Sequence, residues 1–193
     1  MKNYGLFYSY KSTGDVLFII FDTSLKATKS EQRGRITVLY HNEHIISYNI
    51  KDVKDIVKIH SEGKIFLPRE ELIEVINYIL KNENLPTLEV MNSSGFYIGE
   101  VIDQNGEVVQ ISLGENKVTA LAKKHLNIND KVVVALNNTI LGNQVTFKET
   151  KANDVLINAH ICAASELGLQ GDDILLVDKD LENGKDFFST EAK

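Results

Sequence analysis

The sequence predicts an α+β chain of two parts, in which a small α/β domain is followed by a small β-barrel. Residues 4–50 contain apolar and alternating runs that are typical of strands. Residues 69–81 repeat apolar side chains at helical spacing, and five short strand patterns follow Gly95. These three observations together predict the fold class.

Four strands are expected in the first part. The polar break at 11–15, which contains Gly14, separates the first two, and Asn42 and Glu43 lie at the bend between the last two, which predicts a hairpin. Residues 22–34 are expected to form a polar loop. The strands are predicted at 4–10, 16–21, 35–40 and 45–50.

The helix predicted at 69–81 has a start signal and an apolar face. Pro68 precedes it, where a missing amide hydrogen costs nothing, and acidic residues in the first turn favour the positive end of the helix dipole. We expect the apolar stripe to pack against the preceding strands. The stripe consists of Leu72, Val75, Ile76, Ile79 and Leu80.

The best domain boundary is the segment 82–94, which is rich in Asn and Ser and contains Pro86. We therefore expect an N-terminal domain at 1–88 and a second domain at 92–180. Residues 181–193 are expected to be a polar C-terminal tail.

The second domain is predicted to be a small barrel or sandwich, because its strands are short and separated by turns. Five strands in about 85 residues fit an oligonucleotide/oligosaccharide-binding (OB) barrel, although periodicity alone does not distinguish it from another small β fold. The strands are predicted at 96–102, 107–113, 117–122, 131–136 and 144–148.

Composition excludes several classes of protein. Cys162 is the one cysteine among 193 residues, so a disulfide framework within the chain is impossible. The net charge of −6 argues against binding nucleic acid through bulk charge. The longest apolar run, Val16 to Phe21, is too short to span a bilayer, and a cytoplasmic protein that does not associate with membranes is expected. Neither a catalytic motif nor a cofactor or metal motif is present in a convincing context, so we expect no enzyme.

The segment 157–169 reads I-N-A-H-I-C-A-A-S-E-L-G-L and carries a distinctive motif. It resembles the closing motif S-x-G-M-[IL]-C-S-x-x-E-L-G-L of the OB-type tRNA-binding domain of the YtpR family, which is also found in phenylalanyl-tRNA synthetase β chains. Segments 96–101 and 129–135 look like the family's first strand and its G-x-K-V-x-V-A stretch. Residues 7–17 resemble its typical start, so the resemblance covers nearly the whole chain.

The resemblance implies a non-catalytic tRNA-binding protein whose OB barrel holds tRNA through its backbone and shape. It also implies a homodimer, and an aminoacyl-tRNA synthetase or the translation machinery as partners. Lysines that could meet phosphates are Lys117, Lys123, Lys124, Lys131, Lys148 and Lys151. Polar contacts are expected from Asn138, Asn158, His160 and Ser165, and base stacking from Tyr97.

Each of these residues also has a structural interpretation. Exposed lysines can be solvated turn residues, Asn138 can be an ordinary turn residue, and Tyr97 can belong to the core. His160 can be a hydrogen-bonded structural histidine. Cys162 stands between Ile161 and two alanines and is interpreted as a small buried residue.

The alternative function is a degenerate OB-fold module that binds proteins and has lost RNA binding. Residues 96–180 contain seven lysines, no arginine and twelve acidic residues, which gives a net charge of −5. Several motif positions also differ from the family, since Ile157 stands in place of serine, Ala159 of glycine and His160 of methionine.

Overall fold

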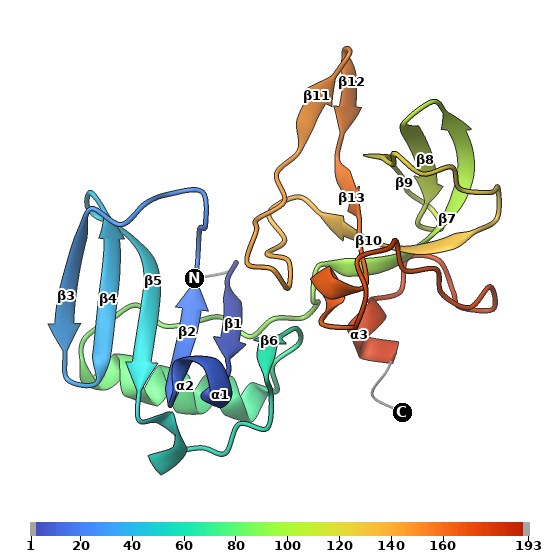
Figure 1. The fold of residues 1–193 in the computed structure, drawn as a ribbon. Coiled ribbons are helices and arrows are strands. Elements are labelled where there is room, and N and C mark those ends of the chain that lie inside the picture. Colours follow the sequence, from blue (N-terminus) through green and yellow to red (C-terminus); the bar gives the residue numbers. More distant parts are fainter. Residues whose placement is uncertain (1–2, 191–193) are drawn as a thin grey trace. The chain divides into compact units, whose positions relative to one another are not determined.

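The computed structural model describes residues 3–190. The chain divides into two compact units, Met1–Asn92 and Ser93–Lys193, and both are built mainly of strands (Figure 1). Among the described residues, none of the helices has the length and hydrophobicity that crossing a membrane would require.

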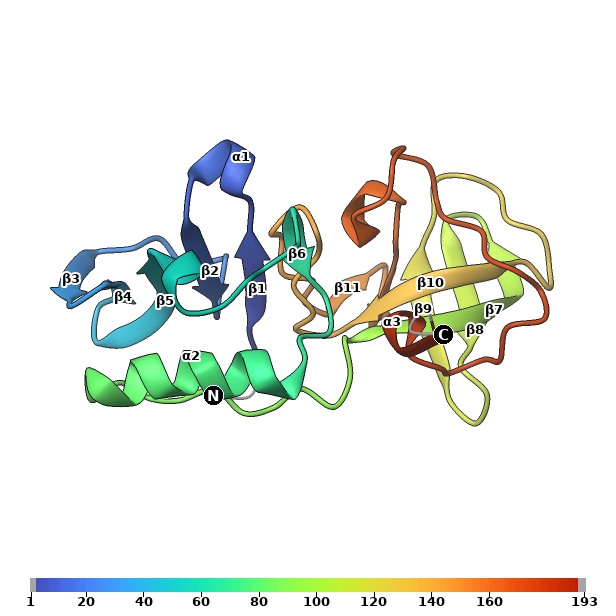
Figure 2. The ribbon, with the colours of Figure 1, turned by 90° about the horizontal axis from the view of Figure 1, so that it is seen from below.

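The first unit is a six-stranded antiparallel sheet with one long helix, α2, along it (Figure 2). The strand order is β3-β4-β5-β2-β1-β6. The strands are β1 Gly5–Tyr8, β2 Val16–Ile20, β3 Lys29–Arg33, β4 Ile36–His41, β5 His44–Lys51 and β6 Gly63–Ile65. The helices are α1 Tyr10–Thr13, the 3-10 turn η1 Val53–Asp55 and α2 Glu70–Asn82.

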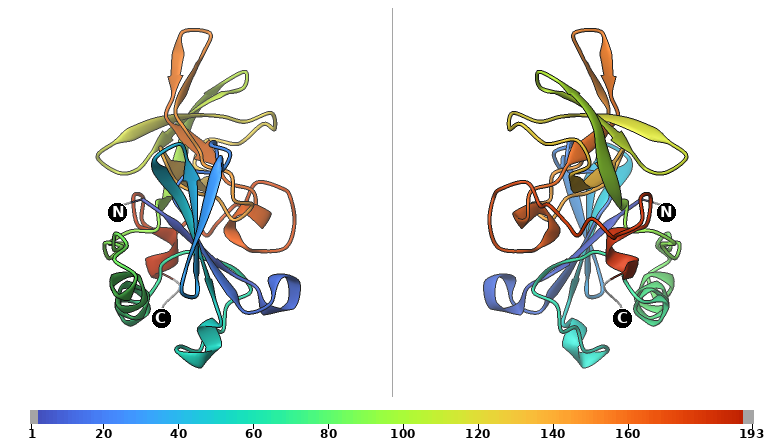
Figure 3. Two further views of the ribbon diagram at one scale, coloured as in Figure 1. Left: turned by 90° about the vertical axis from the view of Figure 1, so that its left-hand side faces the viewer. Right: turned by 90° about the vertical axis from the view of Figure 1, so that its right-hand side faces the viewer.

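The predicted helix is confirmed, and its apolar face packs on the sheet, although this face includes Ile73, which was not predicted, and Leu72 and Val75 are only partly buried. Helix α2 lies to one side of the sheet, as Figure 3 shows, and contributes Ile73, Ile76, Ile79 and Leu80 to the core. The sheet contributes Leu17, Ile19, Ile36, Val38, Tyr48 and Ile50, among others, to the same core. Burying a large aliphatic side chain is worth roughly 1.5–3 kcal/mol, so this contact stabilises the unit.

The expected polar loop at 22–34 is wrong in part, because Lys29–Arg33 forms the edge strand β3. This strand pairs with β4 and has mainly exposed, polar side chains. A polar edge strand has no apolar alternation to reveal it, and its charges discourage pairing with other chains. The first unit is therefore mainly sheet, with a single long helix.

The second unit is a nearly closed five-stranded antiparallel barrel, consistent with an OB-like barrel. The strand order is β13-β10-β7-β8-β9, and β9 comes back into contact with β13. The barrel strands are β7 Phe96–Asn105, β8 Val108–Ser112, β9 Lys117–Leu121, β10 Lys131–Leu136 and β13 Ala159–Ile161. A separate hairpin consists of β11 Thr150–Ala152 and β12 Val155–Ile157, and short helical turns lie at η2 Ser165–Leu167 and α3 Phe187–Thr190.

The barrel core is filled by inward-facing small and branched side chains. Strand β7 pairs with β10 from Phe96 to Glu100 and with β8 from Glu100 to Asn105, and the register of the β7–β8 ladder shifts between Val101 and Asp103. Inward-facing residues of the five strands include Val101, Val109, Ile111, Val118, Ala120, Val132, Val134, Ala159 and Ile161.

Four of the five predicted barrel strands are confirmed, but the fifth is wrong. Residues 144–148 form a tight loop in which Gln144 has a φ of 68° and Thr146 makes a single bridge to Ile140. The fifth barrel strand is β13, which lies within the motif 157–169. Only three residues of β13 pair with β10, so the strand is too short for an alternation pattern to reveal it.

The segment expected to form a polar tail, 181–193, is described up to Thr190, and this part packs against the barrel. Gly184 donates its amide hydrogen to the Ile98 carbonyl, and Ile98 donates to the Lys185 carbonyl. The Asp186 carboxylate accepts hydrogen bonds from the amide and hydroxyl groups of Ser94, and Phe187 is buried. The C-terminal segment thus hydrogen-bonds to the first half of β7, which β8 does not reach.

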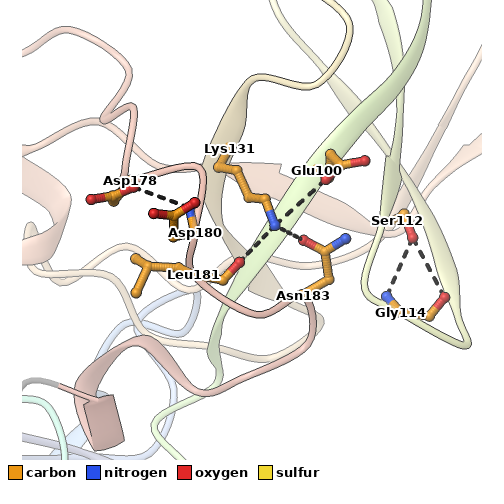
Figure 4. A network of polar contacts seen from close by, with 8 residues as sticks. All are labelled: Glu100, Ser112, Gly114, Lys131, Asp178, Asp180, Leu181 and Asn183. Atoms are coloured by element: carbon orange, nitrogen blue, oxygen red, sulfur yellow. Dashed lines mark hydrogen bonds and ion pairs between the residues drawn. The ribbon is translucent and has the colours of Figure 1, made fainter.

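Lys131, one of the lysines expected to meet phosphate, is instead buried at the centre of this attachment. Its ammonium group donates to the Leu181 carbonyl at 2.6 Å and to Asn183 Oδ1 at 2.8 Å (Figure 4). Glu100 Oε2 lies 3.5 Å from the same nitrogen. The side chain is unavailable to RNA because its donors hold the C-terminal segment on the barrel.

The replacement Lys131→Met tests this anchor. Methionine keeps most of the aliphatic stem but leaves two acceptors without their charged donor. We expect a loss of about 1.5–3 kcal/mol in the free energy of unfolding, measured with urea. Lys117→Met, at an exposed position, is the control and should change it by less than about 0.5 kcal/mol. Equal effects of both changes would contradict the anchoring role.

Candidate nucleic-acid interface

The outer sides of strands β8 and β9 form a polar surface, here called the β8–β9 outer face. Burial alternates along both strands, so that Val109, Ile111, Val118 and Ala120 point into the core. The remaining side chains point outward, as the two-residue period of a strand requires. They are Val108, Gln110, Ser112, Lys117, Thr119 and Leu121.

Neutral hydrogen-bonding groups occupy the middle of this face. Gln110 and Thr119 are paired across the strands, and the Gln110 amide donates to the Thr119 hydroxyl at 2.9 Å. Such groups can contact sugar hydroxyls and base edges without a charge to desolvate. Sequence analysis did not single out these two residues, although the alternation of β8 and β9 would have identified them.

Lysines lie at both ends of the outer face. Lys117 is exposed at the start of β9, and Lys123 is exposed two positions after Leu121, where β9 ends. At about 3.3 Å per residue the two positions are up to about 20 Å apart along the chain. Lys124 is also exposed, and its ammonium group lies 3.7 Å from Asp173. An exposed ion pair of this kind contributes little to stability.

The loop that carries Lys123 and Lys124 is fixed by the turn between β7 and β8. Ala122 donates its amide hydrogen to the Glu107 carbonyl, and the Gln104 amide group donates to the Lys124 carbonyl at 3.3 Å. Leu126 in turn donates to Gln104 Oε1 at 2.8 Å. The two lysines therefore extend from a backbone that the barrel holds in place.

Asn158 has a structural position at the seam of the barrel. The backbone amide of Asn158 donates to the Thr119 carbonyl at 3.1 Å. The side-chain oxygen Oδ1 of Asn158 accepts a hydrogen bond from the Thr119 backbone amide at 2.8 Å. The side chain thus replaces a backbone carbonyl and joins β9 to the chain entering β13. Its oxygen is already occupied and contributes to closure of the barrel.

Three of the predicted site residues lie in the long connection between β10 and β13. Asn138 is exposed with a φ of 65° and donates its amide hydrogen to the Phe147 carbonyl, which is the behaviour of a turn residue. Lys148 and Lys151 are exposed, and Lys151 faces Leu156 across the β11–β12 hairpin. Figure 1 shows the tip of this hairpin projecting from the barrel, while its strand β12 contacts β9.

His160 and Ser165 both lie in the closing motif, but His160 is partly buried and Ser165 is exposed. The His160 ring nitrogen Nε2 lies 2.8 Å from Glu166 Oε2, and its ring lies 5.8 Å from that of Phe147. Ser165 is exposed, and its amide hydrogen bonds to the Gly171 carbonyl. His160 is therefore already hydrogen-bonded within the motif.

The matched residues of the motif have structural roles. Cys162 and Leu167 are buried, and Gly168 has a φ of 75°, which glycine adopts without strain. Glu166 Oε2 also accepts a hydrogen bond from the Ala163 amide at 2.8 Å. A side chain at Gly142 would collide with the Glu166 carbonyl, since its Cβ would lie 2.6 Å from that oxygen. The motif is thus a tightly constructed turn.

Tyr97 is half-buried against the barrel core rather than standing free on a surface. Its hydroxyl group donates to Ser93 Oγ at 3.0 Å, and the residue pairs with Val134 of β10. The neighbouring Phe96 is fully buried and contacts the Phe188 ring. The β8–β9 outer face, which lies on other strands, does not include either ring.

The carboxylate of Glu166 is held in its charged form. Burial raises the pKa of this carboxyl, but hydrogen bonds from the His160 ring and the Ala163 amide, together with the Asn143 side chain, lower it by more, so the pKa lies below its usual value of 4.5. The negative charge of Glu166 lies in the closing turn, where the His160 ring and the Ala163 amide partly compensate it.

Comparisons with known proteins concern mainly the first unit. A family model described as a domain of unknown function, DUF4479, matches residues 23–90. A search of the curated proteins gave no match. The family match lies outside the barrel and does not bear on the β8–β9 outer face.

Changes at Asn158 test its role in closing the barrel. Asn158→Leu removes the acceptor of the Thr119 amide, and we expect a loss of about 1–3 kcal/mol in the free energy of unfolding. Asn158→Asp keeps an acceptor oxygen and should lose clearly less. Urea unfolding followed by circular dichroism measures both. If the leucine variant unfolds like the unmodified protein, the structural role is wrong.

The lowered pKa of Glu166 makes stability depend on pH. Because the folded pKa lies below the unfolded value of 4.5, the carboxylate stabilises the fold above that pH, and this contribution disappears as the pH falls through the folded pKa. Glu166→Gln should therefore be less stable at pH 7 and lose less stability on acidification. Thermal unfolding from pH 7 to pH 3 checks this, with exposed Glu149→Gln as the control. Parallel pH profiles for Glu166→Gln and the unmodified protein would refute it.

Proposed function

We propose that the chain is a YtpR-type protein whose second unit is an OB fold that binds tRNA, and that the RNA lies on the β8–β9 outer face. The function is non-catalytic. The synthetases or the translation machinery are the proposed partners, and a homodimer is the proposed assembly.

Strand order supports the OB assignment. Numbered within the barrel, the strands follow the order 1-2-3-5-4, and the fourth pairs with the first. OB folds bind oligonucleotides on the face of strands two and three and on the loops between strands one and two and strands four and five. Here these elements are β8 and β9, the turn after Asn105, and the long connection that carries Lys148 and Lys151.

The observation that carries the proposal is the distribution of charge along β9. Exposed Lys117 and Lys123 flank the uncharged Thr119 and Leu121. Phosphates can meet the two ammonium groups while riboses and bases contact the neutral middle. With lysines and no arginine on this domain, the contacts are point-charge contacts, which favour backbone and shape recognition over sequence reading.

A tRNA titration tests the proposal. Fluorescence anisotropy with bulk tRNA over a range of salt concentrations should show binding that weakens steadily as salt rises. The double variant Lys117→Glu with Lys123→Glu should bind at least about tenfold more weakly, and its logarithmic salt slope should fall by about one for each lysine.

The matched control is Lys58→Glu with Lys179→Glu, which changes the net charge equally at exposed positions that belong to neither β8 nor β9. This control should bind tRNA nearly as well as the unmodified protein. Equal weakening in both double variants would indicate non-specific charge and would reject the β8–β9 outer face as the site.

The alternative is a protein-binding module without RNA binding. Exposed apolar side chains on the connection between β10 and β13 favour it, namely those of Val145, Val155 and Leu156. Absence of tRNA binding at low salt, together with capture of a stoichiometric synthetase from RNase-treated lysate, would favour this alternative over the first proposal.

A further inference from the structure

Three side chains of different chemistry converge inside the closing motif. His160 lies on β13, Cys162 directly follows it, and Glu166 belongs to the turn η2. Each offers one donor atom, and these three atoms lie within 4.8 Å of one another. A nitrogen, a sulfur and an oxygen donor therefore lie close together.

The backbone holds these residues together. Cys162 donates its amide hydrogen to the Val133 carbonyl at 2.9 Å, which continues the pairing of β13 with β10. The chain then turns, and Glu166 returns to accept from the Ala163 amide. The close approach of Gly142 to the Glu166 carbonyl fixes the far side of the turn. Backbone contacts thus hold the cluster in place, and the Ala163 amide binds the same Glu166 oxygen, Oε2, that faces His160.

The donor set matches zinc. A thiolate, an imidazole and a carboxylate are all zinc ligands, at about 2.3 Å for sulfur, 2.0 Å for nitrogen and 2.1 Å for oxygen. Tetrahedral bonds of these lengths place the donor atoms about 3.4–3.6 Å apart. The His160 and Glu166 atoms, now 2.8 Å apart, would separate slightly, and the most distant pair would approach by up to about 1.2 Å. Side-chain rotation can supply movements of this size.

We propose that His160, Cys162 and Glu166 bind one Zn²⁺, with a water molecule in the fourth position. The Cys162 thiol loses its proton to solvent when the metal binds. The His160 side chain is 34% exposed and Cys162 is buried, so the proposed ion enters from the side of the His160 ring. This site stands independently of RNA binding, because it uses none of the lysines of the β8–β9 outer face.

The single cysteine makes the test specific. Cobalt bound to a thiolate gives a sulfur-to-metal charge-transfer absorption band, and in this chain that sulfur can come only from Cys162. Titration of the full-length protein with Co²⁺ should show this band with one ion per chain, and Zn²⁺ should displace it. Cys162→Ser should abolish the band and weaken Zn²⁺ binding by at least tenfold.

Two further variants separate this cluster from other ligands. His160→Gln and Glu166→Gln should each weaken Zn²⁺ binding at least tenfold, and His125→Gln, at an exposed loop position, should leave it unchanged. Thermal unfolding without metal shows whether each variant folds. If variants fail to fold, X-ray absorption of the zinc-loaded unmodified protein should show one sulfur at about 2.3 Å. Absence of sulfur from the metal's ligands, or zinc binding that survives Cys162→Ser, would overturn the proposal.

Discussion

The barrel depends on the contact between Asn158 and Thr119. Every other pair of neighbouring barrel strands is joined by an antiparallel ladder. At the seam, the two hydrogen bonds between Asn158 and Thr119 join β9 to the chain entering β13. Because Thr119 lies in the middle of the β8–β9 outer face and His160 follows two residues after Asn158, this seam positions both the proposed RNA surface and the closing motif. A side-chain amide is suited to this place, since it supplies an acceptor where the two backbones do not continue as a ladder.

Elements with a strong apolar period were predictable from the sequence, and those without one were not. Helix α2 and strands β7 to β10 bury one side or more, so burial leaves its pattern in the residues. Strand β13 buries Ala159 and Ile161, but at three residues it is too short to show an alternation. The edge strand β3 is held by backbone pairing with β4. Backbone hydrogen bonds are available to any non-proline residue, so strands that depend on them leave little trace in side-chain chemistry. The apolar alternation of 144–148 indicated a strand, yet this segment is a local loop.

The same distinction applies to the candidate site. Sequence shows which residues carry amides and charges, and Lys117, Lys123, Lys124, Lys148 and Lys151 are indeed exposed. It does not show where a side chain points. Lys131 and Asn158 differ from the exposed residues of the same type only in their tertiary partners, which lie dozens of residues away along the chain. The matched residues of the closing motif build a turn, so the motif supports the fold more directly than the binding chemistry.

A net negative charge and a local RNA-binding surface are compatible because charge acts over a limited distance. At physiological salt the Debye length is about 8 Å, so an exposed carboxylate on another side of the barrel is largely screened from a phosphate on β9. What matters is the charge beside the phosphate. Lys124 has Asp173 within 3.7 Å and is partly compensated, whereas Glu166 directs its charge into the closing turn toward His160 and the Ala163 amide. Asp173 therefore partly compensates Lys124, and the proposed RNA binding would depend on the local balance of charge around Lys117 and Lys123 rather than on the total charge.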